Sequence, residues 1–184
     1  MRRLDTEQQS YKKFFLQSWL ELENQYRKGN IDPQHENDVV CYLYHALAKK
    51  FAQKRFPLYF IKTEDTRNLK NGSLRPDLNL NDRLFIEVKL YHLRDYRQGW
   101  KRRQEVIEYT VDKLKQYVAY QKSISGVHVR EPILAVWFRK RKLAGNTNSG
   151  DKYFLNDDLI KKLAAERDRY KGSATILFGP TNPK

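Results

Sequence analysis

Leu84-Phe85-Ile86-Glu87-Val88-Lys89-Leu90 is the stretch of sequence that decides the fold. The apolar residues at 84, 86, 88 and 90 fall on one face, because successive side chains of a strand point to opposite sides. Glu87 and Lys89 fall on the other face together with Phe85. The alternation predicts a half-buried strand from which a carboxylate and an ammonium group project side by side.

A second alternating strand is predicted immediately upstream, over residues 74–80. A slip of one residue between two paired strands turns every side chain to the other face, so burial selects the register. A register that places Leu78 opposite Ile86 also places Asp77 opposite Glu87, with the apolar residues on one face and the acids on the other. This register requires a loop with an odd number of residues, such as a three-residue turn. Hydrophobic patterning therefore predicts that Asp77 and Glu87 are cross-strand neighbours.

A helix is predicted before these strands. Asp32-Pro33 is typical of a helix start, with Asp as the N-cap and Pro at the first helical position. Glu36 lies one turn before Val40, the first residue of an apolar stripe that continues to Phe51. An acid in the first turn of a helix also complements the helix dipole, so a structural and a functional role are equally well supported for Glu36.

Further periodic segments complete the predicted order of elements. The strand patterns cover 58–63, 132–138 and 173–178, and the helix patterns cover 100–121 and 157–170. Residues 66–73 are predicted to be a loop. From residue 32 to residue 138, the order is helix, three strands, helix, strand.

Pro76-Asp77 followed by Glu87-Val88-Lys89 resembles the signature of the PD-(D/E)XK nucleases, the restriction-endonuclease-like superfamily. The resemblance covers about residues 32–138. It implies an α/β fold with an αβββαβ core, in which helices flank a central mixed sheet, here with an added N-terminal helix. Gln116 and Tyr120, one turn apart on the predicted helix 100–121, are similar to the extra motif of the RecB-like and lambda-exonuclease-like branch. A surface pair explains this spacing equally well.

The resemblance implies a Mg²⁺-dependent nuclease, with Mn²⁺ able to substitute, that hydrolyses phosphodiester bonds. Asp77 and Glu87 would bind the metal together with the backbone carbonyl of Val88, and Glu36 would assist as a further acid. Lys89 would orient the attacking water or stabilise negative charge. Gln116 and Tyr120 are expected to contact the substrate or to steady the lysine.

The charge of the chain favours nucleic acid as the partner. Lys and Arg number 36 against 22 Asp and Glu, which gives a net charge of +14. The basic cluster Arg139-Lys140-Arg141-Lys142 directly follows a predicted core strand, so Arg139 and Lys140 are predicted to bind substrate, although a single basic cluster is more commonly a solvated face. DNA is favoured. An RNA-cleaving enzyme of the same fold and a non-catalytic nucleic-acid-binding module remain the alternatives.

One domain is predicted over residues 1–184, with a helical extension at 1–30, a core at 32–138, and a loop, helix and strand at 139–184. A membrane span and a signal peptide have no counterpart in the sequence, so a cytoplasmic protein is expected. A homo-oligomer is compatible with the sequence. The single cysteine, Cys41, is expected to be a buried residue of the first core helix.

Overall fold

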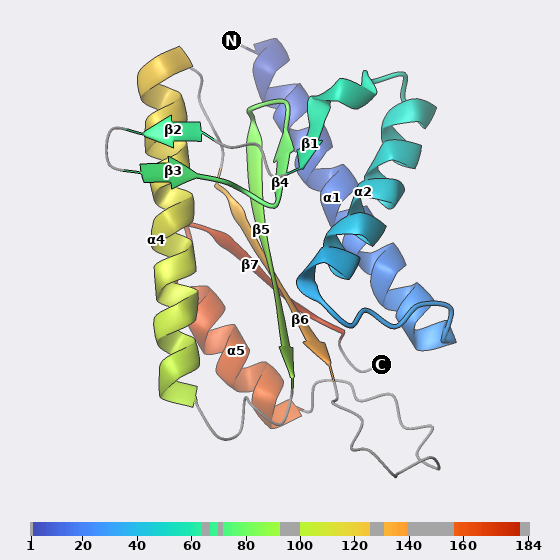
Figure 1. Cartoon of the computed structure of the whole chain (residues 1–184), viewed down its shortest axis with the longest axis vertical. Coiled ribbons are helices and arrows are strands. Elements are labelled where there is room, and N and C mark those ends of the chain that lie inside the picture. Colours follow the sequence, from blue (N-terminus) through green and yellow to red (C-terminus); the bar gives the residue numbers. More distant parts are fainter. Residues whose placement is uncertain are drawn as a thin grey trace.

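The computed structural model describes residues 2–63, 67–69, 72–92, 100–125, 131–139 and 157–180. Helices flank a five-stranded sheet in an α/β arrangement (Figure 1). The helices are α1 (Arg2–Lys28), α2 (Glu36–Gln53), α4 (Trp100–Ser125) and α5 (Asp157–Arg169), with a short 3₁₀ helix at Leu58–Phe60. The strands are β1 (Ile61–Thr63), β2 (Arg67–Leu69), β3 (Gly72–Leu74), β4 (Leu78–Leu80), β5 (Leu84–His92), β6 (Ile133–Arg139) and β7 (Thr175–Gly179).

The five-stranded sheet is mixed, and its order is β1-β4-β5-β6-β7. Strands β1, β4 and β5 pair antiparallel, whereas β5, β6 and β7 pair parallel. The parallel pairs are joined through helices, as a crossover between parallel strands requires. The predicted α/β class with a central mixed sheet is confirmed.

The predicted register of the hairpin is also confirmed. Strand β4 pairs with β5 so that Leu78 lies opposite Ile86 and Leu80 opposite Leu84, and a three-residue turn joins them. The side chain of Asn79 stabilises this turn, because its Oδ1 accepts the backbone N–H of Asp82 at 2.9 Å. Asp82 has a positive φ of 54°, a conformation that Asp tolerates better than most residues.

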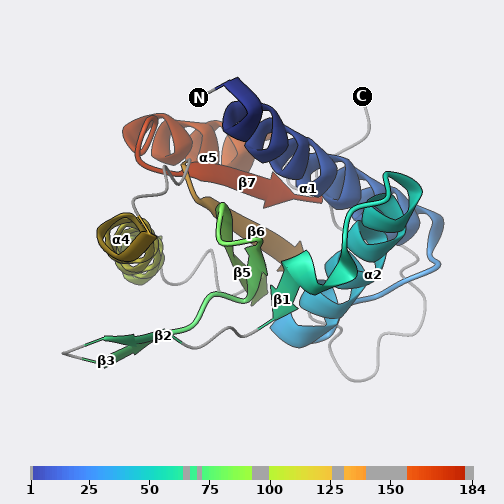
Figure 2. The same ribbon diagram turned by 90° about the horizontal axis from the view of Figure 1, so that it is seen from above.

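Helices α1 and α2 lie on one face of the sheet and α4 and α5 on the other (Figure 2), and each face carries its own hydrophobic core. Leu84, Ile86 and Val88 of β5 pack with α1 and α2, whereas Phe85 packs with α4 and α5 on the opposite face. Helix α1 supplies six buried residues to the first core, namely Tyr11, Phe14, Phe15, Trp19, Leu22 and Tyr26. The N-terminal helix is therefore an integral layer of the fold.

Helix α2 begins later than the sequence predicts. Its first residue is Glu36 and its N-cap is His35, so the prediction of a start at Asp32 was wrong. Asp38 explains the observed start, because its carboxylate accepts the backbone N–H groups of Gln34 at 2.7 Å and of His35 at 2.9 Å. These are backbone donors that a helix start leaves without an internal partner.

Three other local predictions were wrong. Residues 58–60 form a 3₁₀ turn after Pro57, so only Ile61–Thr63 is a strand. Part of the segment predicted as a loop at 66–73 pairs with itself as the two-stranded sheet β2–β3. Cys41 is exposed, because the buried stripe of α2 runs through Val39 and Leu43 and leaves Cys41 on the other side of the helix.

In the described ranges, none of the helices is long and apolar enough to span a membrane.

Candidate active site

The candidate site lies along the part of strand β5 that extends beyond its pairing with β4. Strand β5 has nine residues and β4 has three, and their pairing ends at Ile86. Beyond Ile86, backbone groups on that edge need other partners. The N–H of Val88 donates to Asp77 Oδ2 at 2.6 Å, and the N–H of Leu90 donates to Glu36 Oε2 at 3.2 Å. Two carboxylates thus take the place of a paired strand along this edge.

Lys89 connects Glu36 with Glu87 across the edge. Its Nζ lies 3.2 Å from Glu87 Oε1 and 3.4 Å from Glu36 Oε1. Glu87 is on β5 itself, whereas Glu36 is the first residue of α2. The pairing of Leu78 with Ile86 is the predicted register, and Asp77 lies directly beyond it, close enough to Glu87 for the two charges to interact. The structure therefore brings together Glu36, Asp77, Glu87 and Lys89, the four residues that the sequence singled out for catalysis.

Lys113 of α4 also belongs to this cluster, and sequence reasoning missed it. Its Nζ lies 2.8 Å from Glu87 Oε1, so this oxygen receives two ammonium groups. Helices α2 and α4 lie on opposite faces of the sheet (Figure 2), so the cluster joins both faces around the open edge of β5. A weak signal was available, because Lys113 lies three residues before Gln116 on the same helix.

The pKa values of the site residues reflect burial and the neighbouring charges. Burial, and then the neighbouring charge of Glu87, raise the pKa of Asp77 from 3.8 to about 6, against the opposing effects of the Val88 N–H and the Lys89 ammonium. Burial lowers the pKa of Lys89, but Glu87, Glu36 and Asp77 together outweigh burial, and the net pKa is raised. Lys89 therefore carries its proton at neutral pH.

The carboxylate oxygens at this edge of β5 are partly engaged with other partners. Among the described residues, no three or more His, Cys, Asp or Glu side chains form a group that could hold a metal ion as they are placed. Asp77 is turned to a backbone N–H, and Glu87 to two lysines. Glu87 Oε2, however, is buried and has no hydrogen-bond partner within the described part of the chain, and a buried carboxylate oxygen in this state is a ready ligand for a hard cation.

The backbone carbonyl of Val88 is a third possible ligand of a metal ion, beside Asp77 and Glu87. Its side chain is fully buried in the core, so only its backbone can contribute to a site. The C=O of a strand residue points to the same edge as its N–H, and the N–H of Val88 faces Asp77. Asp77, Glu87 and the Val88 carbonyl are all oxygen donors, the type that Mg²⁺ prefers, so the residues present fit such an ion.

The predicted substrate-binding residues have different positions. Gln116 is exposed on α4 and Tyr120 is half-buried one turn further along, and contact with substrate stays a prediction for both. Arg139 is 8% exposed, and its guanidinium donates to both carboxylate oxygens of Asp32 at 3.1 Å. This ion pair ties the end of β6 to the segment before α2. Lys140 lies outside the described residues.

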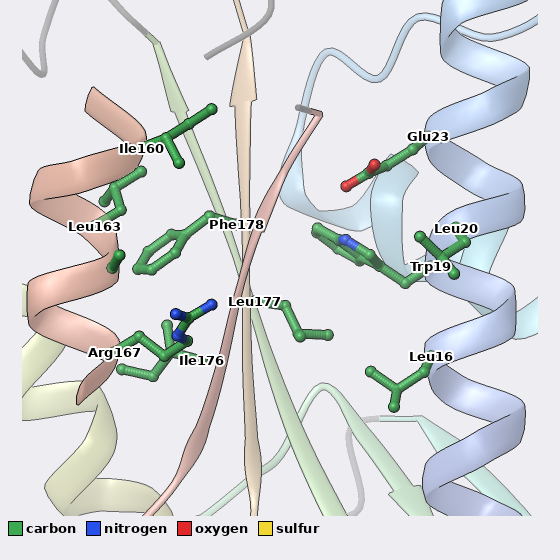
Figure 3. Close-up of a pocket in the computed structure, with 11 residues that line it drawn as sticks. Leu16, Trp19, Leu20, Glu23, Ile160, Leu163, Arg167, Ile176, Leu177 and Phe178 are labelled. Atoms are coloured by element: carbon green, nitrogen blue, oxygen red, sulfur yellow. The ribbon is translucent and has the colours of Figure 1, made fainter. Parts of the chain in front are cut away.

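A separate apolar groove of about 390 Å³ lies over β7, between α1 and α5 (Figure 3). Among the described residues that line it, only Glu23 and Arg167 are charged. Gly179 has no room for a side chain there, because a Cβ would collide with the Glu23 carboxylate and closely approach the Trp19 ring. The groove shares no residue with the carboxylate and lysine cluster, and its lining offers little for catalysis.

No protein-family model matches the chain, and neither a curated protein nor a solved structure is significantly similar to it.

Proposed function

We propose that the protein is a Mg²⁺-dependent nuclease of the PD-(D/E)XK type that hydrolyses phosphodiester bonds in DNA. One observation carries the proposal, namely the convergence of Glu36, Asp77, Glu87 and Lys89 on the open edge of β5 through contacts of 2.6 to 3.4 Å. With the separate β2–β3 hairpin set aside, the order α2, β1, β4, β5, α4, β6 supports it, since it resembles the αβββαβ core of that superfamily.

In the proposed reaction, Asp77, Glu87 and the Val88 carbonyl would hold Mg²⁺ or Mn²⁺. The bound metal supplies positive charge for the scissile phosphate and lowers the pKa of a coordinated water. Glu36 accepts from both the Lys89 ammonium and the Leu90 N–H, and so holds the lysine at the edge of the strand.

Lys89 acts as a hydrogen-bond donor in this scheme. Because its pKa is raised, it stays protonated at neutral pH and has no free electron pair with which to remove a proton. Its ammonium orients the attacking water or stabilises the negative charge that grows on the phosphate.

The charge of the chain supports nucleic acid as the substrate. A net charge of +14 on 184 residues favours a partner with a repeating negative charge. The choice of DNA over RNA is tested directly by the substrates below.

The test is an incubation of the purified protein with supercoiled plasmid, linear duplex DNA, single-stranded DNA and RNA, in Mg²⁺, Mn²⁺ or a chelator. We expect metal-dependent cleavage of DNA that is lost in Asp77→Asn and Lys89→Met. Asp112→Asn and Lys115→Met are matched controls, because these two residues form an ion pair with each other on the exposed side of α4 and, among the described residues, with no other charged side chain. Cleavage by Asp77→Asn at the wild-type rate would refute the assignment, and cleavage of RNA alone would change the substrate class.

A further inference from the structure

Lys113 is the nearest charged partner of Glu87, and it lies outside the motif that indicates a nuclease. Its Nζ is 2.8 Å from Glu87 Oε1, compared with 3.2 Å for Lys89. We propose that Lys113 is a positioning residue, which neutralises Glu87 when no metal is bound and competes with the metal for the same carboxylate. This proposal rests on the proposed function, because it assigns Glu87 as a metal ligand.

The burial of Glu87 explains why a second ammonium is needed. The side chain of Glu87 is 4% exposed, and a buried carboxylate without a compensating charge strongly destabilises a fold. Lys89 supplies only part of this compensation, because it also contacts Glu36. Lys113 has no other carboxylate partner within the described part of the chain.

The position of Lys113 allows its ammonium group to move away from Glu87. Its side chain is 25% exposed, so the ammonium can move from Glu87 into water without being desolvated. Tyr117, one turn further along α4, is buried against Phe85, and its ring centroid is 6.0 Å from Lys113 Nζ. The helix that carries the lysine is thus anchored in the core, while the charged end can exchange partners.

The charges of the cluster indicate how Lys113 affects metal binding. The three carboxylates and two ammonium groups of the cluster leave one net negative charge when all are ionised. A divalent cation would make the site positive by one, and one phosphodiester group would then make it neutral. Lys113 therefore disfavours metal binding in the absence of substrate and couples metal binding to substrate binding.

The experiment is a calorimetric titration of Ca²⁺ and Mn²⁺ into the wild type, Lys113→Met, Lys113→Arg and Lys115→Met. The Ca²⁺ titration is repeated in the presence of a short DNA duplex. We expect Lys113→Met to lower the metal Kd about ten-fold without DNA, because a repelling charge has been removed. Lys113→Arg keeps the charge and should retain the wild-type Kd. The exposed Lys115 is the control, and its substitution should leave the Kd unchanged. DNA should tighten Ca²⁺ binding to the wild type more than to Lys113→Met.

The direction of the change separates this proposal from a purely structural role. If Lys113 only supported the fold, Lys113→Met would weaken metal binding or leave it unchanged, and either result would overturn the proposal. If Lys113→Met fails to fold, the proposal is tested by a structure of the wild type with metal bound. In that structure, a Lys113 Nζ that still contacts Glu87 Oε1 would also overturn the proposal. An active wild type with an unchanged Kd in Lys113→Met refutes only the role of Lys113. An inactive wild type with a tightened Kd in that variant refutes only the nuclease.

Discussion

Asp77 is expected to destabilise the protein at neutral pH when no metal is bound. Its pKa is about 6 in the folded protein, against 3.8 as the ordinary value. Between pH 4 and pH 6 the folded state therefore binds a proton that the unfolded state has released. The free energy of unfolding falls as the pH rises through this window, and the loss is complete above pH 6. A shift from 3.8 to about 6 corresponds to about 3 kcal/mol.

Asp77→Asn removes the charge and keeps an oxygen that can accept the Val88 N–H. In a chelator at pH 7.5, we expect the variant to be more stable than the wild type by about 2 to 3 kcal/mol, and the difference to vanish near pH 4. The assay is urea unfolding followed by tryptophan fluorescence at several pH values. Asp112→Asn, which changes an exposed acid on α4 in the same way, is the matched control.

A bound metal should reverse the difference in stability between the wild type and Asp77→Asn. A divalent ion at 100 times its Kd stabilises the native wild type by about 2.7 kcal/mol, whereas Asp77→Asn has lost a ligand charge and should gain little. The wild type would then equal or exceed the variant in the same unfolding assay. A variant that is less stable than the wild type by the same amount at every pH, with and without metal, would refute the reasoning.

Three further predictions concern Lys89, Gly179 and the positive charge of the protein. Lys89→Met should abolish single-turnover cleavage while calorimetry shows metal binding retained or tightened, because a positive charge leaves the site; a rate within a few-fold of wild type would contradict its role. Gly179→Ala should lower the free energy of unfolding by about 1 to 3 kcal/mol, because the added Cβ would collide with Glu23 and closely approach Trp19. An unchanged thermal unfolding midpoint would show that α1 can move to make room for it. Affinity for duplex DNA in Ca²⁺ should fall steeply with salt, and a flat plot of log affinity against log salt would argue against a phosphate-binding surface.

The sequence predicted the centre of the site because burial and chemistry coincide there. The apolar residues of β4 and β5 permit one register, and that register brings Asp77 and Glu87 together whatever their function. Lys113 could not be predicted in the same way, because a lysine beside a buried helical stripe is common and its partner depends on how α4 packs. The start of α2 was mispredicted because Asp32, which resembles an N-cap, instead binds Arg139 at the end of β6.

The unequal lengths of β4 and β5 explain why chemistry would be placed at this edge. Were β4 longer, backbone carbonyls would accept the N–H groups of Val88 and Leu90, and the edge would be closed. Because β4 begins only at Leu78, the carboxylates of Asp77 and Glu36 accept them, and both side chains are held in place before any ligand arrives. Fixed ligands need little reorganisation in a reaction, but burying Asp77 and placing it close to Glu87 disfavours its charged form, which raises the pKa of Asp77. The instability predicted for Asp77 at neutral pH and the readiness of the site for a cation therefore have the same physical origin.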